Sequence, residues 1–258
     1  MNIPFTKYQG TGNDFIIIDN RNRAYDHVDV LQLCTPKFGI GADGLMLLQT
    51  IEGYDFEMVY YNSDGNISTM CGNGGRCIAD FAHRLGIFGD KTTFKAIDGP
   101  HDALWAPDKV ALKMQDVNGI SKDSVAFVLN TGSPHYVLFG SDVKSIDIVP
   151  TARQIRYNDT YKQEGININF AEITGADSIR VRTYERGVEN ETLSCGTGVT
   201  ASAIAFAENT ALPDGNHLIR IETPGGHLSV KFNKANGNYT GVWLTGEAKP
   251  VFSGNVEQ

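Results

Sequence analysis

The sequence MCGNGGRC, residues 70–77, decides how the rest of the chain can be interpreted, because SCGTG at 194–198 repeats its core. In both stretches a cysteine precedes a glycine-rich turn, and each turn leads into a segment typical of a helix. We expect these helices over about residues 75–85 and 199–208. A cysteine at a helix N-terminus lies beside unpaired N–H groups and the positive end of the helix dipole, which favour the thiolate. Cys71 and Cys195 therefore indicate one site built from two equivalent halves.

Other segments repeat at nearly the same distance along the chain. Thr11–Phe15 matches Thr131–His135 at an offset of 120, and the cysteine turns match at an offset of 124. Residues 92–99 resemble residues 218–226 at an offset of about 126. Nearly constant offsets indicate an internal duplication.

Length and composition are compatible with a duplicated globular chain. The 258 residues are 41% hydrophobic and 20% charged, which is ordinary for a soluble protein. The net charge of −8 provides no basic patch, so we expect neither nucleic acid nor a membrane as a partner. Apolar runs such as residues 15–18 are too short to cross a bilayer, and no export signal is visible. We therefore expect a cytoplasmic enzyme.

The four cysteines are too few and too scattered for a disulfide scaffold, and their spacing fits no zinc pattern. We expect no metal. Cys34 lies on an apolar stretch and Cys77 on the inner face of its helix, so packing is the better interpretation of both.

The two expected helices differ in composition. The first has apolar residues such as Ile78 and Phe81 on one side and Arg76 and Asp80 elsewhere, which predicts an amphipathic helix. The second has no charged residue from 192 to 207, which predicts burial on all sides. Its N-terminal cysteine would then lie in an interior cleft.

Two facing thiols suit the inversion of a stereocentre. If the two helix N-termini face one another across a pseudo-twofold axis, a small substrate between them has one sulfur on each face of a carbon atom. The N–H groups of the turns could bind a carboxylate on that carbon and stabilise the charge that develops when its proton leaves. One cysteine would remove the proton as a thiolate, and the other would deliver a proton to the opposite face as a thiol.

The stretch at 70–77, preceded by NSDG at 62–65 and joined with ERG at 185–187 and ETLSCGTG at 191–198, resembles the diaminopimelate epimerase family. The resemblance covers almost the whole chain. It implies an α+β protein with two pseudo-symmetric domains, each a curled mixed or antiparallel sheet around a central helix. We place these domains at residues 1–116 and 117–246, with the tail 247–258 packing on the first. The resemblance also implies a homodimer.

In activity, the resemblance implies cofactor-independent epimerisation of L,L-diaminopimelate to the meso form, for lysine and peptidoglycan synthesis. Cys71 and Cys195 would be the acid/base pair. The residues it implies for substrate binding fall into two groups. At the reacting end they are Gly72, Asn73, Gly196 and Thr197; at the far end they are Asn13, Asn62, Asn167, Glu185 and Arg186, with His135 near the site.

Two features depart from the family pattern. Ser133 stands where an asparagine precedes Pro-His, and a serine has a shorter reach for a hydrogen bond to the substrate. The segment 185–192 is one residue longer and more acidic than the commonest form. Both departures bear on the identity of the substrate rather than on the chemistry.

Three other interpretations stay open. The nearest is a racemase of another amino acid on the same scaffold, although proline-type racemases fit less well because they carry histidine where Asn73 stands. From other classes come a binding module without catalysis and a redox protein in which Cys71 and Cys195 form a regulatory disulfide. Oxidation of two facing thiols would, however, inactivate an epimerase.

Overall fold

The computed structural model describes residues 2–258 and divides the chain into two compact units. The first unit holds the residues up to Leu112 together with Gly246–Gln258, and the second unit holds Lys113–Thr245. The helices and strands of the first unit are β1 (Asn2–Gly10), β2 (Asn13–Asp19), α1 (Val30–Cys34), β3 (Gly44–Gln49), β4 (Glu57–Asn62), α2 (Gly72–Arg84), β5 (Lys91–Ala96), β6 (Gly99–Ala106), β7 (Lys109–Lys113) and β18 (Lys249–Glu257).

The second unit follows the same plan with more elements. They are β8 (Val117–Asn118), β9 (Ser121–Asp123), β10 (Ala126–Asn130), β11 (Pro134–Phe139), the short 3-10 helix η1 (Val143–Ser145), α3 (Ile148–Arg156), β12 (Asn167–Gly175), β13 (Ser178–Glu185), β14 (Asn190–Thr192), α4 (Gly196–Asn209), β15 (Gly215–Thr223), β16 (Gly226–Ala235) and β17 (Asn238–Gly246).

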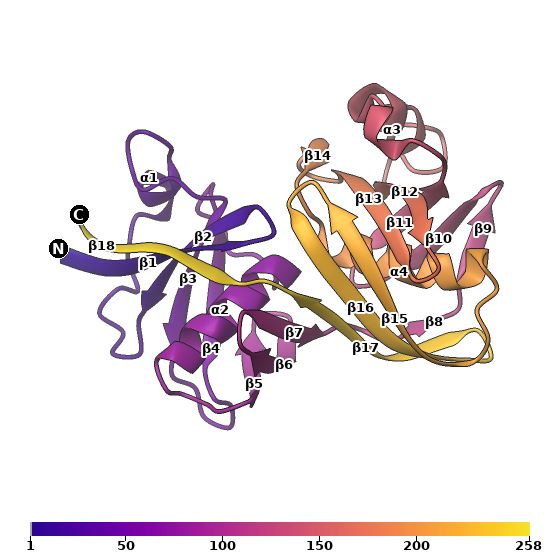
Figure 1. Ribbon diagram of the computed structural model, residues 1–258. Coiled ribbons are helices and arrows are strands. Elements are labelled where there is room, and N and C mark those ends of the chain that lie inside the picture. Colours follow the sequence, from indigo (N-terminus) through magenta and orange to yellow (C-terminus); the bar gives the residue numbers. More distant parts are fainter. Residues whose placement is uncertain (1) are drawn as a thin grey trace. The chain divides into compact units, whose positions relative to one another are not determined.

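The order of strand pairings is the same in both units. From β1 to β6 the successive pairs alternate between antiparallel and parallel, beginning and ending with an antiparallel pair. The strands β10, β11, β12, β13, β15 and β16 repeat this alternation step by step. The structure therefore confirms the predicted α+β class and the duplication. At the two ends of the chain, β1 and β18 run antiparallel to one another (Figure 1).

Each unit holds one long helix against its sheet. In the first unit, α2 lies between β4 and β5 in the chain and packs on β1, β2, β3, β6 and β18. In the second, α4 lies between β13 and β15 and packs on β10 to β13, β15 and β16 (Figure 1). A parallel pair of strands needs a crossover connection, and the helix supplies it in both units. In each unit the helix that begins after the cysteine thus packs on the strands of that unit.

Both helices begin three residues earlier than the sequence predicted. α2 starts at Gly72 and α4 at Gly196, so Cys71 and Cys195 are themselves the N-cap residues, with extended backbone angles (φ −92°, ψ 133° and φ −113°, ψ 113°). The sequence assigned the glycines to turns because glycine usually weakens a helix.

Close packing explains why glycines occupy the first helical turns. A Cβ on Gly75 would lie 2.9 Å from the sulfur of Met70, and a Cβ on Gly198 would lie 2.4 Å from Oδ1 of Asn169. Both contacts are shorter than van der Waals contact allows. The glycines therefore let Met70, in the segment before α2, and Asn169 of β12 approach the helices, and the cost in helix propensity is offset by that packing.

The expected amphipathic pattern of α2 is wrong for two of its charged residues. Arg76 and Asp80 are buried, at 0% and 2% exposure. Asp80 accepts hydrogen bonds from Tyr8 Oη at 3.0 Å, Trp105 Nε1 at 2.9 Å and Arg84 Nε at 2.6 Å. A buried charge is stable only when it is paired and hydrogen-bonded. Arg84 lies on the same helix, but Tyr8 and Trp105 come from β1 and β6, which periodicity does not reveal.

The other predictions about burial are confirmed. Almost every residue of α4 from Gly196 to Ala207 is buried, as its lack of charge predicted. Cys34 and Cys77 are buried free thiols, and burial raises the pKa of Cys34 to about 11. A Cβ on Gly10 would lie 3.0 Å from the sulfur of Cys77, so this thiol fills space beside β1.

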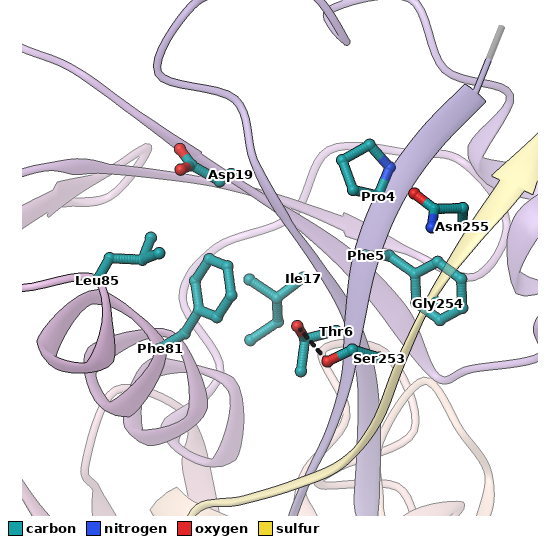
Figure 2. Close-up of a pocket in the computed structure, with 10 residues that line it drawn as sticks. All are labelled: Pro4, Phe5, Thr6, Ile17, Asp19, Phe81, Leu85, Ser253, Gly254 and Asn255. Atoms are coloured by element: carbon teal, nitrogen blue, oxygen red, sulfur yellow. Dashed lines mark hydrogen bonds between the residues drawn. The ribbon is translucent and has the colours of Figure 1, made fainter.

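An open groove of about 460 Å³ lies in the first unit between β1, β18 and the last turns of α2 (Figure 2). Phe5, Ile17 and Phe81 supply its apolar wall. None of its described lining residues is a candidate site residue.

No helix among residues 2–258 is long and apolar enough to span a membrane.

We expect Asp80→Ala to lower the free energy of unfolding by about 3 kcal/mol, because it leaves the buried Tyr8 donor and the partly buried Trp105 donor without an acceptor. Urea unfolding followed by far-UV circular dichroism measures the loss. Arg84→Ala is the matched control, since its half-exposed guanidinium contributes at most about 1 kcal/mol to the same pair. Equal losses in the two variants would contradict this account.

Candidate active site

The first half of the candidate site surrounds the N-terminal turn of α2. Asn73, which is 1% exposed, donates a hydrogen bond from Nδ2 to Oδ1 of Asn13 at 2.8 Å. Its own Oδ1 accepts hydrogen bonds from Thr11 Oγ1 at 3.2 Å and from Arg76 Nη2 at 2.9 Å. The turn that follows Cys71 is therefore fixed by side chains of the β1–β2 connection and of its own helix.

Arg76 places a positive charge beneath this turn. Its Nη1 donates to the carbonyl oxygen of Gly72 at 3.1 Å, and its Nη2 also reaches Thr11 Oγ1 at 3.0 Å. Burial lowers the pKa of Arg76, while Cys77 and Cys71 nearby raise it. An arginine nevertheless stays charged in proteins. The cation adds to the helix dipole and favours an anion at this N-terminus. Sequence reasoning missed this role, although the arginine is part of the stretch at 70–77.

The asparagines of the first unit lie at one edge of its sheet. Asn13 begins β2, and Asn62 ends β4 opposite Gly44, which in turn lies opposite Phe15 of β2. Asp43, just before β3, accepts a hydrogen bond from Asn13 Nδ2 at 2.6 Å. The structure therefore brings Asn13 and Asn73 into contact and places Asn62 at the same end of the sheet.

The second half of the candidate site is built in the same way. Cys195 is 8% exposed, and its sulfur lies 3.5 Å from Oγ1 of Thr197. Thr131 donates to the carbonyl oxygen of Thr197 at 2.8 Å, just as its repeat partner Thr11 bonds Asn73. The position equivalent to Arg76 is Thr200, whose Oγ1 donates to the carbonyl oxygen of Gly196 at 2.9 Å. The second half therefore lacks the buried cation of the first.

In the second unit, several residues expected at the far end of the substrate are joined by hydrogen bonds. Asn167 donates from Nδ2 to Ser133 Oγ at 2.9 Å and to the carbonyl oxygen of Pro134 at 3.0 Å. Its Oδ1 accepts a hydrogen bond from the backbone N–H of Arg186 at 2.9 Å. Ser133 is thus directed at Asn167, which lies on the neighbouring strand.

Glu185 and Arg186 do not obey the alternation of a strand, because β13 ends at Glu185. Glu185 accepts a hydrogen bond from Thr192 Oγ1. The exposed Arg186 begins the following turn and donates from Nη1 to the carbonyl oxygen of Glu164 at 2.9 Å. Two adjacent charged residues can therefore serve the same region.

Glu189 closes the turn that carries Arg186. It accepts hydrogen bonds from Tyr157 Oη at 2.7 Å, Tyr184 Oη at 3.0 Å and Arg156 Nη2 at 3.0 Å. Burial alone would raise the pKa of Glu189, but these donors, with the Gly187 N–H, hold it at about 2. The acidic character of residues 185–192, which looked like a departure in sequence, here stabilises the turn.

A model of the family described as "Diaminopimelate epimerase" matches residues 5–118 and 127–251 of this chain. The chain belongs to the diaminopimelate epimerase family. Among curated relatives, the diaminopimelate epimerase of Flavobacterium psychrophilum is 49% identical, over 97% of this chain and 98% of its own length. That of Chlorobaculum tepidum is 39% identical, over 96% and 98%.

Solved structures share the fold of this diaminopimelate epimerase family member at low sequence identity. A PhzF-family phenazine biosynthesis protein from Bacillus anthracis is 13% identical with a TM-score of 0.77, and the match covers 100% of both chains. A probable proline racemase from Agrobacterium radiobacter is 13% identical with a TM-score of 0.65, over 99% of this chain and 93% of that one. These likenesses concern the fold alone.

Both half-sites of this diaminopimelate epimerase family member place a thiol beside a helix N-terminus that can bind an anion. The first N–H groups of a helix have no acceptor within the helix and bind anions readily. In each unit such a turn follows directly after a cysteine. A buried threonine, Thr11 in the β1–β2 connection and Thr131 in the β10–β11 connection, holds the turn by a hydrogen bond. Each half-site can therefore combine a thiol with anion binding.

Replacing Glu189 by glutamine tests how the Arg186 turn is held. The carboxylate has a pKa of about 2 in the fold and about 4.3 in the unfolded chain, so it stabilises the protein above pH about 4.3. That contribution disappears as the pH falls through 2. We expect Glu189→Gln to lower the free energy of unfolding by about 1 kcal/mol at pH 7, a value reduced by solvent screening.

Denaturant titrations of both proteins from pH 7 to pH 2 measure the difference, which should shrink towards zero at the acid end. Glu52→Gln, at an exposed position of the first unit, is the matched control and should change nothing. A difference between wild type and Glu189→Gln that stays constant with pH would contradict the electrostatic explanation.

Proposed function

We propose that this chain epimerises L,L-diaminopimelate to meso-diaminopimelate, a step of lysine and peptidoglycan synthesis, with Cys71 and Cys195 as its acid and base. Membership of the family supports the reaction. The observation that supports the two-cysteine mechanism is that both thiols occupy the N-cap of the long helix in their unit, where the repeat places equivalent residues. A thiol at that position is favoured as a thiolate.

The proposed reaction moves one proton off the α-carbon and another onto it. One cysteine, as thiolate, removes the α-proton and becomes a thiol. The electron pair left on the carbon spreads into the adjacent carboxylate, which the first-turn N–H groups of α2 and α4 stabilise. The other cysteine donates its proton to the opposite face and becomes a thiolate. The stereocentre is inverted, and the exchange of roles lets the enzyme act on both isomers.

The two half-sites surround the reacting carboxylate with different groups in this scheme. At the reacting end we assign binding of the carboxylate to Gly72, Asn73, Gly196 and Thr197. The buried charge of Arg76 strengthens this on the side of Cys71, and the uncharged Thr200 stands at the equivalent position on the side of Cys195. A buried cation at this position beside Cys71, with an uncharged residue at the same position beside Cys195, makes the two cysteines chemically unequal before the substrate binds.

At the far end of the substrate we assign the remaining candidates. The guanidinium of Arg186 suits a carboxylate, and Glu185 suits an ammonium group. Asn13 and Asn62 in the first unit and Asn167 in the second supply amide groups. Ser133 already accepts a hydrogen bond from Asn167, so it acts on the substrate through that amide rather than in place of a longer asparagine.

A racemase of another amino acid is the alternative. It would keep both cysteines and differ at the far end. The departure at Ser133 is the observation that favours it, and the hydrogen-bonded chain from Ser133 through Asn167 to Arg186 weakens it.

We expect Cys71→Ala and Cys195→Ala each to lower turnover of L,L-diaminopimelate by at least about 10³-fold, because either change removes one partner of the proton transfer. Incubation in deuterated water, followed by mass spectrometry and chiral chromatography, detects both the exchange and the inversion. Cys34→Ala is the matched control, since its buried thiol lies on the short helix α1, and it should retain full turnover.

Substantial turnover by Cys71→Ala would rule out the two-cysteine mechanism. A panel of single amino acids in the same assay tests the alternative. Exchange with one of them, and none with diaminopimelate, would replace the proposed substrate; no exchange with any compound would favour binding or redox function.

We also propose that the protein forms a homodimer through β18. Val251 and Phe252 on this strand are 56% and 50% exposed. Phe252 packs edge-on against Phe5, and Phe5 lines the groove of Figure 2. Exposed apolar patches of this kind are typical of protein interfaces.

Phe252→Lys should convert the dimer to a monomer in sedimentation velocity, because it places a charge in the proposed apolar contact. Phe38→Lys is the matched control, as Phe38 is 83% exposed in the same unit but far along the chain, and it should leave the dimer intact. A dimer that resists Phe252→Lys, or a monomeric wild type, would contradict the proposed interface.

A further inference from the structure

A buried polar chain lies beneath the N-terminus of α4. Thr183 Oγ1 donates to Oδ1 of Asn169 at 2.9 Å, and Nδ2 of Asn169 lies 3.1 Å from Nδ1 of His135. These three side chains are between 0% and 3% exposed. They connect the strands β11, β12 and β13 directly below the turn that carries Cys195.

The first unit shows that this polarity is not required by the fold. Phe15 and Met46 occupy the positions in β2 and β3 that His135 and Asn169 occupy in β11 and β12, judged by strand register. There a Cβ on Gly74 would contact the sulfur of Met46 at 3.4 Å and the ring of Phe15 at 3.5 Å. The same space under the helix is apolar in one half and polar in the other, so the polar chain serves something besides packing.

The orientation of the Asn169 amide is determined by a backbone group. Its Nδ2 lies 3.2 Å from the carbonyl oxygen of Tyr136, which can only accept a hydrogen bond. The atom that faces Tyr136 must therefore be the NH₂ group, and the same NH₂ group faces Nδ1 of His135. Since an amide NH₂ only donates, Nδ1 of His135 must be the acceptor and carries no proton.

The remaining proton of the imidazole is then on Nε2. Burial, with a smaller effect of Arg186, lowers the pKa of His135 to about 3, so the ring is neutral. A neutral imidazole with an unprotonated Nδ1 carries its proton on Nε2. Nε2 is buried and has no hydrogen-bond partner within residues 2–258. An unsatisfied buried donor is costly, and such groups are retained where a bound molecule completes them.

We propose that Asn169 is a positioning residue that holds His135 in its neutral Nε2–H form, so that His135 acts in the reaction as a hydrogen-bond donor and not as a base. The role of the Nε2–H donor in the reaction rests on the proposed function. It does not depend on which cysteine removes the proton. The acceptor is an anionic group formed or bound at the Cys195 side of the site. A Cβ on Gly198 would lie 2.4 Å from Asn169 Oδ1 and 3.3 Å from the sulfur of Cys195, which places the amide close beneath that thiol.

The decisive experiment changes the donor at Nδ1 into an acceptor. Asn169→Asp keeps the shape of the side chain but presents a carboxylate oxygen to His135, which then needs a proton on Nδ1. Long-range ¹H–¹⁵N NMR of the histidine rings in the ligand-free protein separates protonated from unprotonated ring nitrogens. We expect an unprotonated Nδ1 and a protonated Nε2 in the wild type, and a protonated Nδ1 in Asn169→Asp.

Kinetics of the same variants separate positioning from stability. We expect Asn169→Asp to lower kcat at least about tenfold with a smaller change in KM, because the donor is needed when charge develops. Asn20→Asp is the matched control: Asn20 is also 0% exposed, and both ends of its amide are bonded, to Asp26 and to the Tyr25 N–H. It should destabilise the first unit while leaving kcat of the folded protein unchanged.

Three results would overturn the inference: a wild-type His135 without a proton on Nε2, an Asn169→Asp variant with unchanged ring protonation, or equal effects of Asn169→Asp and Asn20→Asp on kcat. Because the NMR measurement needs no turnover, a protein inactive towards diaminopimelate would refute the proposed function and leave the assigned protonation intact. Asn169→Ala removes the donor without adding a charge and supplies a second measurement if Asn169→Asp does not fold. We expect the ring to stay neutral and to show a mixture of its two tautomers, with the proton shared between Nδ1 and Nε2.

Discussion

The structure depends on one constraint, which is that the N-terminal turn of a helix must fit against the sheet that curls around it. Unsatisfied N–H groups are expensive when buried and valuable when an anion is bound. Both units meet the constraint by beginning the helix immediately after a cysteine and by using glycines where a side chain would collide with Met70 or Asn169. The position of the thiol, the burial of the helix and the capacity to bind a carboxylate follow from that packing.

The duplication gives the two units equivalent backbones, but their side chains have diverged at the points that matter for chemistry. Arg76 supplies a buried cation beneath the first turn, where Thr200 stands in the second. His135 and Asn169 supply a polar chain beneath the second turn, where Phe15 and Met46 fill the first. A symmetric frame therefore carries two unequal half-sites. This arrangement suits a reaction that treats both faces of one carbon atom while recognising a substrate with a second, unchanged stereocentre.

Much of the candidate site could be predicted from the sequence, because the prediction depends on local patterns. The paired cysteine turns, the repeat offset and the uncharged second helix each follow from spacing and composition. The contacts of Asn13 with Asn73 and of Ser133 with Asn167 join residues that the resemblance had already selected, without revealing how they meet. Arg76, Asp80 and Asn169 were missed or misplaced, because whether a polar side chain is exposed or buried depends on partners such as Tyr8, Trp105 and Thr183 that lie far away in the chain.

The sequence by itself determined that the chain is duplicated and has two cysteines at helix N-termini, because glycine placement and repetition are properties of short segments. The resemblance to the family supplied the α+β class. Only the tertiary structure decided where the helices begin, which charges are buried and which ring nitrogen of His135 carries the proton. Those features depend on the atoms that approach from other strands. The carbonyl oxygen of Tyr136, which fixes the direction of the Asn169 amide, belongs to the backbone and leaves no trace in the identity of any residue.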